Sequence, residues 1–364
     1  MAHPAGLDFL VNKIDWKQHR FDDAPVPELA DGQVLFRVDR FAFTANNISY
    51  ALSGDMLGYW RFFPAPDGWG RLPTMGYADV IESKHADVAV GTRCFGFYPM
   101  SRYLMIEPSA VNLAGITDGA PHRADISPLY NQYSPTTGDA LYQPDHEDAL
   151  MLMRGLFMTS YLASDFITDR GFGEQAVLIS SASSKTSIAL GHLVSSAGRA
   201  SSVGLTSARN LEFVRKLGCY DEVLTYDEVG SLDATRPTVY VDMAGSSTVR
   251  RAVHDHFGAQ LKHSCSIGAT HWEERGGDDE SLPGPKPEFF FAPGQGQKRS
   301  AEWGPQEFQR RLAEAWSGFR NFSEGWLEVQ RGHGRKAIER VYENTLAGRT
   351  DPQHGHVLSL WDDA

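Results

Sequence analysis

Hydroxyl and ammonium side chains that can hold phosphate gather in one short stretch, residues 180–187, which reads Ser-Ser-Ala-Ser-Ser-Lys-Thr-Ser. Hydroxyl groups donate hydrogen bonds to phosphate oxygens, and a lysine neutralises their charge. An apolar run at 176–179 precedes the stretch and an amphipathic segment follows it. We therefore expect a turn between a buried strand and a helix, which is where phosphates bind. The residues predicted to contact the phosphates of a dinucleotide are Ser183, Ser184, Lys185 and Thr186.

Two other interpretations of this stretch stay open. A serine-rich start of a helix is also typical of an ordinary N-cap with a solvated lysine beside it. The Lys-Thr pair further resembles the end of a nucleoside-triphosphate loop. That loop needs a glycine directly before the lysine and another five residues earlier, where this chain has Ser184 and Ile179.

The second strand of the same region favours NADP(H) over NAD. A site for NAD usually carries Asp or Glu roughly 20 residues past the phosphate turn, where the acid holds the ribose hydroxyls. Residues 205–210 instead read Leu-Thr-Ser-Ala-Arg-Asn, and hydroxyls with a guanidinium suit a 2′-phosphate. A tyrosine that ends the third strand can contact the same phosphate or cover the adenine. The residues concerned are Thr206, Ser207, Arg209, Asn210 and Tyr226. The alternative for the arginine is an ordinary surface charge at a helix start.

Two patterns along the chain must position these residues. The first part is β-rich and predicts a small barrel or sandwich, with strands expected at 32–38, 78–81, 93–97 and 103–106. From residue 175 strands and helices alternate, which implies a parallel sheet with right-handed crossovers. Its expected strands are 176–179, 202–205, 222–225, 239–241 and 264–267, and its expected helices are 184–197, 208–217 and 247–257.

The connecting segments are less regular. Residues 115–148 are rich in Pro, Asp, Tyr and Asn, and we interpret them as a long ordered excursion or lid. A helix is expected at 147–168. Further along we expect a surface loop at 276–287, helices at 306–326 and 336–346, and a closing strand at 356–361.

Composition limits the class of protein. A chain of 364 residues suggests two domains. The net charge of −12 is spread along the chain, so no basic face for nucleic acid is expected. Three well-separated cysteines predict reduced thiols and a cytoplasmic location. Neither a signal peptide nor a membrane-spanning segment is visible.

Several segments resemble the medium-chain dehydrogenase/reductase superfamily, and the likeness covers most of the chain. Residues 32–38 look like its opening strand, and residues 45–54 look like the quinone-oxidoreductase segment that usually reads N-P-x-D followed by a Gly. Residues 90–96 resemble the G-D-R-V-x-G turn of the superfamily. Residues 210–226 resemble its "L-G-A" helix end with the strand that follows, and residues 241–245 resemble its fourth Rossmann strand.

Within that superfamily the chain looks closest to a group described only as a domain of unknown function, DUF2855. The segments that carry this likeness are His122-Arg123, Tyr130-Asn131-Gln132-Tyr133, 153–157, 206–210 and 268–272. The resemblance implies an α/β fold with a GroES-like β-barrel catalytic domain and a Rossmann-type doubly wound parallel sheet. The catalytic domain would comprise 1–150 and 305–364, and the NADP-binding domain 151–304. By the same resemblance Asn46 would touch the nicotinamide, and Ala244 and Gly268 would line the cofactor.

Two departures from the superfamily bear on the chemistry. Its glycine-rich turn aligns with serine, lysine and threonine here, so the cofactor is expected to sit differently or bind more weakly. The zinc-dependent branch needs a Cys or Asp followed by a His after the opening strand. Residues 46–54 contain none of these, and the cysteines form no cluster. We therefore expect no metal.

Hydride transfer to a carbonyl or an activated alkene builds negative charge on oxygen, which a protein group must stabilise or protonate. The candidates for this role are Tyr50, Tyr59 and His271. Each tyrosine can instead be a core or rim aromatic, and the histidine can be an ordinary loop residue. A polar substrate pocket could be formed by Arg123, Tyr130, Tyr133 and Arg154. Arg154 can equally serve only to anchor the excursion through an ion pair.

The resulting hypothesis is a zinc-independent reductase that takes hydride from NADPH and reduces a carbonyl or an α,β-unsaturated carbonyl, with a bulky or aromatic small molecule as substrate. Two alternatives stay open: an NADP(H)-binding sensor or scaffold without turnover, and a lyase or hydratase on the same fold. A homodimer is expected because edge strands of such sheets often pair across a two-fold axis.

Overall fold

The computed structural model describes residues 3–56, 58–112, 115–126, 130–173, 175–267 and 282–362. The chain divides into two compact units. The first comprises Met1–Leu152 and Leu327–Ala364, and the second comprises Met153–Trp326. The chain returns to the first unit at Leu327, later than the expected boundary at residue 305. No helix among the described residues is both long and apolar enough to cross a membrane.

The first unit holds two sheets. The smaller one has the order β2-β1-β4, with β1 at Gly6–Asn12, β2 at His19–Ala24 and β4 at Trp69–Gly70. The larger sheet is built around β3 (Val34–Phe43), which pairs antiparallel with β5 (Pro73–Ser83) and β7 (Tyr103–Ile106). β5 also pairs with β6 (Arg93–Pro99). On the other side of β3 lies β18 (His354–Ser359), followed by β17 (Glu328–His333).

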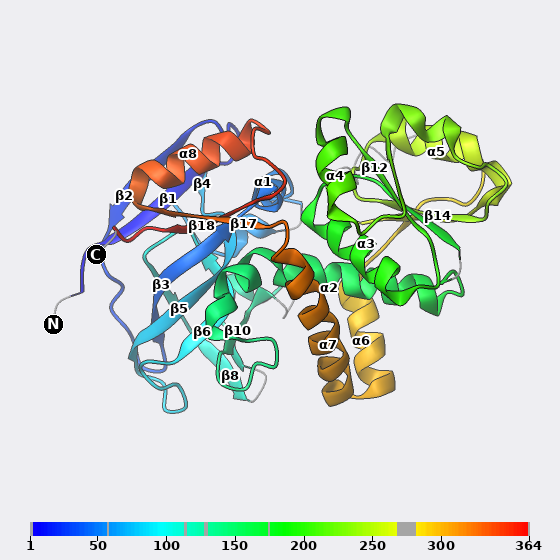
Figure 1. Cartoon of the computed structure of the whole chain (residues 1–364). Helices are drawn as coiled ribbons and strands as arrows, with labels where there is room; N and C mark the ends of the chain where they lie inside the picture. Colours follow the sequence, from blue (N-terminus) through cyan, green and yellow to red (C-terminus); the bar gives the residue numbers. More distant parts are fainter. Residues whose placement is uncertain are drawn as a thin grey trace. The chain divides into compact units, whose positions relative to one another are not determined.

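Three helical segments accompany these sheets: α1 (Ala45–Leu52), η1 (Tyr59–Arg61) and α8 (Gly334–Leu346). In Figure 1, α8 lies over β17 and β18, which it contacts. Val34, Phe36 and Val38 of β3 are buried in one core cluster with Ile338 and Tyr342 of α8. The strand is not half-buried as its alternation predicted, because Leu35 on the opposite face is buried in a second cluster with Leu29 and Tyr103.

The excursion is more ordered than its composition indicated. It contains β9 (Gly115–Asp118) and β10 (Gln132–Pro135), and β9 pairs with β8 (Pro108–Asn112). β10 connects this extension to β6. The 3-10 helices η2 (Pro121–Arg123) and η4 (Pro144–His146) lie in the same stretch. Strands of four residues are too short to display a clear alternation, so the pattern predicts an ordered excursion or lid here but not its strands.

The second unit contains a six-stranded sheet with the order β13-β12-β11-β14-β15-β16. Every pair in it is parallel, which confirms the expected parallel sheet. The strands are β11 (Ala176–Ile179), β12 (Ser202–Thr206), β13 (Glu222–Thr225), β14 (Thr238–Asp242), β15 (Leu261–Ser266) and β16 (Glu288–Phe289).

Helices cover both faces of this sheet. α3 (Lys185–Ala197) and α4 (Leu211–Leu217) lie on one side of it in Figure 1, and α5 (Ser247–Phe257) lies on the other. The predicted helix ends are confirmed at Gly198 and Gly218, which cap α3 and α4 with φ angles of 64° and 69°. Such left-handed conformations are favourable for glycine because it has no Cβ. Short 3-10 helices follow β12 and β13, at η5 (Ala208–Asn210) and η6 (Tyr226–Ser231), and a third, η7 (Gly258–Gln260), follows α5.

Three longer helices complete the second unit: α2 (Glu147–Asp169), which begins in the first unit, α6 (Ala292–Trp303) and α7 (Pro305–Ser323). α6 was not predicted, because its opening Ala-Pro-Gly-Gln-Gly has low helix propensity. Polar contacts with α2 compensate. Gln295 donates to Asp165 at 2.5 Å, and Arg299 pairs with both Asp165 and Asp169.

Candidate functional site

The end of β11 is tied to the end of β14 by one buried serine. The hydroxyl of Ser180 donates to Asp242 Oδ1 at 3.0 Å and accepts the backbone N–H groups of Met243 and Ala244 at 2.9 and 3.0 Å. The Asp242 carboxylate also accepts the N–H groups of Ala244 and Gly245, at 3.1 and 2.9 Å. This network fixes the loop after β14 beside the phosphate turn, and it explains how Ala244 is positioned.

Ser181 takes the backbone conformation that a glycine would normally supply in this turn. Its φ is 50°, and among the described residues it is the only one other than glycine with a positive φ. Its backbone N–H donates to the hydroxyl of Tyr226 at 3.2 Å. The turn therefore keeps a left-handed step without glycine, and Tyr226 lies directly against it.

Exchanging Ser181 tests this conformation. A left-handed residue with a side chain costs about 1–2 kcal/mol, and a glycine costs about 0.5–1 kcal/mol in unfolded-chain entropy. Ser181→Gly is therefore expected to leave the free energy of unfolding unchanged or to raise it by up to about 1 kcal/mol. Ser181→Val, with a β-branched side chain, is expected to lower it by more than about 1 kcal/mol. Urea unfolding of both variants measures the difference, and equal stability of the two would contradict a fixed left-handed turn.

The middle of the turn rests on β12. Ala182 donates its N–H to Leu205 O at 2.9 Å, and the hydroxyl of Tyr220 donates to Ala182 O at 3.0 Å. Gly204 lies so close beneath that a Cβ on it would stand 2.9 Å from the Cβ of Ala182. The close approach between the turn and the sheet thus depends on a glycine of β12, Gly204, and not on a glycine in the turn itself.

The start of α3 confirms the N-cap interpretation of the serine-rich stretch, and contact of the same residues with phosphate stays a prediction. Ser184 is the N-cap, and its hydroxyl accepts the N–H of Ser187 at 3.2 Å and donates to the Ser187 hydroxyl at 2.8 Å. Ser183 accepts a hydrogen bond from the Asn210 side chain at 3.0 Å, which joins the turn to η5. Lys185 is the first residue of the helix, and burial lowers its pKa to about 8.

The residues predicted for the 2′-phosphate follow β12 as expected. Thr206 ends the strand and is 1% exposed, and its buried hydroxyl has no hydrogen-bond partner among the described residues. Ser207 is the N-cap of η5, and Arg209 is exposed on η5. The structure brings these residues to the same edge of the sheet as the phosphate turn, since β11 and β12 are parallel neighbours.

Asp242 and its ion-pair partner were not singled out from the sequence. Asp242 is 2% exposed, and its Oδ2 is 3.7 Å from Nε of Arg250 in α5, which is 6% exposed. The sequence does contain a sign of this pair, because a carboxylate ends a strand, β14, whose residues are all buried. An acid in that place must be held by donors, because a buried charge without partners is very costly.

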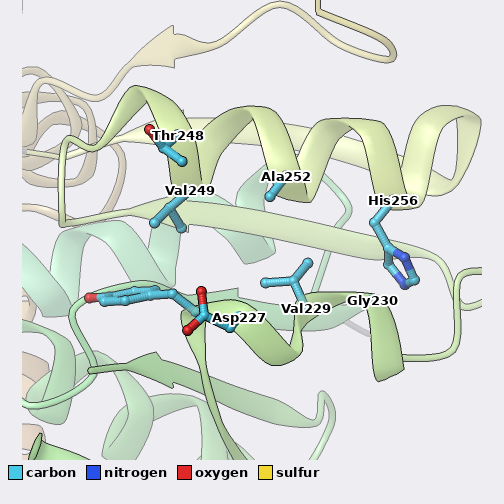
Figure 2. Close-up of a pocket in the computed structure, with 8 residues that line it drawn as sticks. Asp227, Val229, Gly230, Thr248, Val249, Ala252 and His256 are labelled. Atoms are coloured by element: carbon cyan, nitrogen blue, oxygen red, sulfur yellow. The ribbon is translucent and has the colours of Figure 1, made fainter. Parts of the chain in front are cut away.

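A shallow cavity of about 360 Å³ lies between η6 and α5. Figure 2 shows its two walls, with Thr248, Val249, Ala252 and His256 from α5 and Asp227, Val229 and Gly230 from η6. Tyr226, the hydrogen-bond partner of the phosphate turn, also lines it. Near the opposite end, the His256 ring lies 2.8 Å from the carbonyl oxygen of Leu232. The cavity is apolar along its sides and extends from the turn.

In the first unit the two candidate catalytic tyrosines lie together. The rings of Tyr50 and Tyr59 are 4.6 Å apart, and Tyr59 is also 6.0 Å from Tyr130 in an edge-on arrangement. Burial raises the pKa of both Tyr50 and Tyr59. These aromatic residues, with Phe62 and Phe97, form what we call the tyrosine cluster.

Other predicted substrate residues have structural partners. Arg123 is fully buried, and it donates to Asp118 at 2.9 Å, to the Tyr133 hydroxyl at 2.8 Å and to Tyr130 O at 2.8 Å. Tyr133 is also fully buried. Neither side chain has surface with which to touch a substrate. Arg154 lies on α2 in the second unit. His271 and Gly268 lie outside the described residues.

The architecture is that of the medium-chain dehydrogenases/reductases, with a GroES-like domain and a parallel Rossmann-type sheet. The chain belongs to the family described as "Protein of unknown function (DUF2855)", which it matches over residues 41–351. A search of the curated proteins found no match.

Solved structures share this fold along nearly the whole chain. CurA from Vibrio vulnificus, crystallised with NADPH, is 13% identical with a TM-score of 0.62, and the match covers 98% of this chain and 100% of CurA. The quinone oxidoreductase from Coxiella burnetii is 14% identical with a TM-score of 0.55, covering 98% and 99%. The CurK enoyl reductase is 13% identical with a TM-score of 0.54, covering 97% and 99%.

Proposed function

We propose that this protein is a zinc-independent oxidoreductase that uses NADPH to reduce the carbonyl or α,β-unsaturated carbonyl group of a small molecule. The observation that carries the proposal is a group of side chains that can donate hydrogen bonds to phosphate, all at one edge of the parallel sheet. The hydrogen bond from Asn210 to Ser183 joins the turn after β11 to η5, which follows β12. The likeness of the fold to an NADPH-bound protein, a quinone oxidoreductase and an enoyl reductase supports it.

The residues of the second unit fit a phosphorylated dinucleotide. No acidic residue occurs in 202–210, so nothing there repels a 2′-phosphate. The exposed Arg209 would offer donors to the 2′-phosphate at the end of β12, whereas Thr206, at 1% exposed, has no surface for the contact predicted for it. Lys185 and the start of α3 suit the pyrophosphate. The cavity beside Tyr226 is within the size range of ligand pockets, about 300–1,000 Å³, and would take the adenine end.

When bound, NADPH supplies the hydride. The tyrosine cluster of the first unit would then bind the acceptor molecule and stabilise the oxygen on which charge develops. Its aromatic rings suit a flat or bulky acceptor. Residues 46–54 contain neither Cys nor His, so hydroxyl groups would perform the role that zinc has in other members of the superfamily.

The proposal is tested by mixing the purified protein with NADPH and a panel of enones, quinones and aldehydes, and by following the loss of NADPH absorbance. We expect oxidation with at least one planar acceptor, and slower oxidation with NADH. NADPH binding without turnover across a broad panel would instead favour a sensor or scaffold. Product formation without NADPH consumption would favour a lyase or hydratase.

We also propose a homodimer that forms through β16. This strand lies at the edge of the described sheet, and Phe289 and Phe291 near it are 36% and 59% exposed. A strand at the edge of a sheet with exposed apolar side chains nearby favours pairing with a second chain. Phe291→Glu is expected to halve the mass measured by light scattering, whereas Ile14→Glu, at a site 94% exposed in the first unit, should not change it. A monomeric parent protein, or a dimer that survives Phe291→Glu, would contradict this interface.

A cytoplasmic location completes the proposal. Cys94, Cys219 and Cys265 are free thiols, and all three are buried. Buried single thiols are typical of proteins from reducing compartments.

A further inference from the structure

Most serines of the phosphate turn use their hydroxyl protons within the protein. The hydroxyl of Ser180 donates to Asp242 at 3.0 Å. That of Ser184 donates to the Ser187 hydroxyl at 2.8 Å, which in turn donates to the carbonyl oxygen of Ser180 at 2.9 Å. A hydroxyl group has only one proton to donate. These three protons therefore hold the turn and the start of α3 together.

Ser183 is different, because its hydroxyl acts as an acceptor. The side-chain amide of Asn210 donates to it at 3.0 Å, and this is the one hydrogen bond that the described residues give this hydroxyl. Ser183 is half-buried, so its side chain keeps some exposed surface. Accepting a hydrogen bond also makes the O–H a stronger donor, since bonded groups polarise one another. Ser183 thus keeps a proton that it can donate to a ligand.

Two contacts place Ser183 beside the end of β12, the second strand of the parallel sheet in sequence order. The N–H of its neighbour Ala182 donates to the carbonyl oxygen of Leu205 in β12 at 2.9 Å. Its own partner, Asn210, ends η5, which follows the same strand. In dinucleotide-binding sheets the 2′ position of the adenosine ribose is bound near the end of this second strand. Ser183 therefore lies on the side of the turn where a 2′-phosphate would be.

We propose that Ser183 is a specificity-determining residue that donates its hydroxyl proton to the 2′-phosphate of NADPH, and that Asn210 is a positioning residue that orients this hydroxyl. NADH carries a hydroxyl group at the same position, without the negative charge that makes such a hydrogen bond strong. The pair therefore favours NADPH over NADH. The inference rests on the proposed use of NADPH, but it does not depend on the reduction of any acceptor.

The test is a double-mutant cycle, read by isothermal titration with NADPH and with NADH. Ser183→Ala is expected to weaken NADPH binding about tenfold, since it removes a hydrogen bond to a charged group. Asn210→Ala should weaken it about threefold, because the serine keeps its proton but loses the partner that orients it. The double variant should bind NADPH no more weakly than Ser183→Ala, because the two residues act as a unit. NADH binding should be unchanged in all three variants.

The comparison with NADH separates this role from a structural one. The Asn210 side chain makes no cap hydrogen bond to α4, so its exchange should leave that helix intact. Equal losses of NADPH and NADH binding would show a distorted turn and would overturn the proposal. Additive losses in the double variant would overturn it too, as would a parent protein with no preference for NADPH. Ser196→Ala removes an exposed serine near the end of α3 and, as the matched control, should keep both affinities.

Two cofactor fragments distinguish this inference from the reductase function. Adenosine 2′,5′-bisphosphate and adenosine 5′-monophosphate differ only in the 2′-phosphate, and neither can deliver a hydride. The parent protein should prefer the bisphosphate, and Ser183→Ala should reduce that preference about tenfold. If this pattern appears and the parent protein reduces no acceptor, the role of Ser183 stands and the reductase function falls. If the parent protein oxidises NADPH while Ser183→Ala keeps the full preference, the role of Ser183 falls and the reductase function stands.

Discussion

Asp242→Ala is expected to destabilise the second unit by about 3–5 kcal/mol, as does the removal of one partner from a buried ion pair. The carboxylate accepts the hydroxyl of Ser180 and the N–H groups of Ala244 and Gly245, and it lies beside the buried Arg250. Without it, two N–H groups lose an acceptor, and the buried Arg250 guanidinium loses the carboxylate of Asp242. The loss should appear as a large fall in the midpoint of urea unfolding.

The control for this prediction is Asp255→Ala, which makes the same exchange at an exposed position of α5. Surface substitutions of this kind usually change stability by less than about 0.5 kcal/mol. Asp242→Asn keeps one acceptor oxygen for the N–H groups and removes only the charge. Its loss of stability should therefore lie between those of Asp242→Ala and Asp255→Ala. A small effect of Asp242→Ala would mean that the network after β14 does not hold the loop.

Lys185→Ala is expected to weaken NADPH binding about 10- to 100-fold, since a hydrogen bond to a charged group contributes about 1.5–3 kcal/mol. Lys185→Arg keeps the charge and should retain most of the affinity. Lys262→Ala removes one exposed lysine from β15 and serves as the control. Isothermal titration with NADPH measures all four proteins.

The same lysine predicts how binding depends on pH. Its pKa is lowered to about 8 in the free protein, and a bound phosphate favours the ammonium form and raises that pKa again. The affinity of the parent protein for NADPH should thus be highest below pH 8 and should fall as the pH rises above it. Lys185→Ala should lack this fall. A parent affinity that is constant from pH 7 to pH 9.5 would place the lysine away from the phosphates.

The sequence predicted the parallel sheet well because its signals are local. The strand 222–225 and the helix 247–257 have the bounds that the pattern indicated, and Gly198 and Gly218 end their helices in the left-handed conformation. Each of these features depends on residues within a few positions of one another, so a periodicity or a cap is sufficient to find it.

The features that the sequence did not predict depend on distant partners. α6 forms from a glycine-rich stretch because Asp165 and Asp169, far away in sequence, pair with its side chains. Arg123 was placed in a substrate pocket because its type suits one, yet Asp118 and Tyr133 enclose it completely. The absence of glycine from the turn at 180–187 is visible in the sequence. That Ser181 nevertheless adopts a left-handed backbone conformation is visible only in the structure, from its φ of 50°.

The place of β18 in the first unit has a consequence for how the chain is made. β18 lies between β17 and β3, so residues 354–359 stand inside the sheet that residues 34–43 begin. While the ribosome is still adding the residues between them, the Phe41–Phe43 end of this edge of β3 has no native neighbour, although its Val34–Arg37 end can already pair with β7. The second unit lies wholly within that interval, so its sheet can close first. We therefore expect chaperones that shield exposed strand edges to act on the first unit during synthesis.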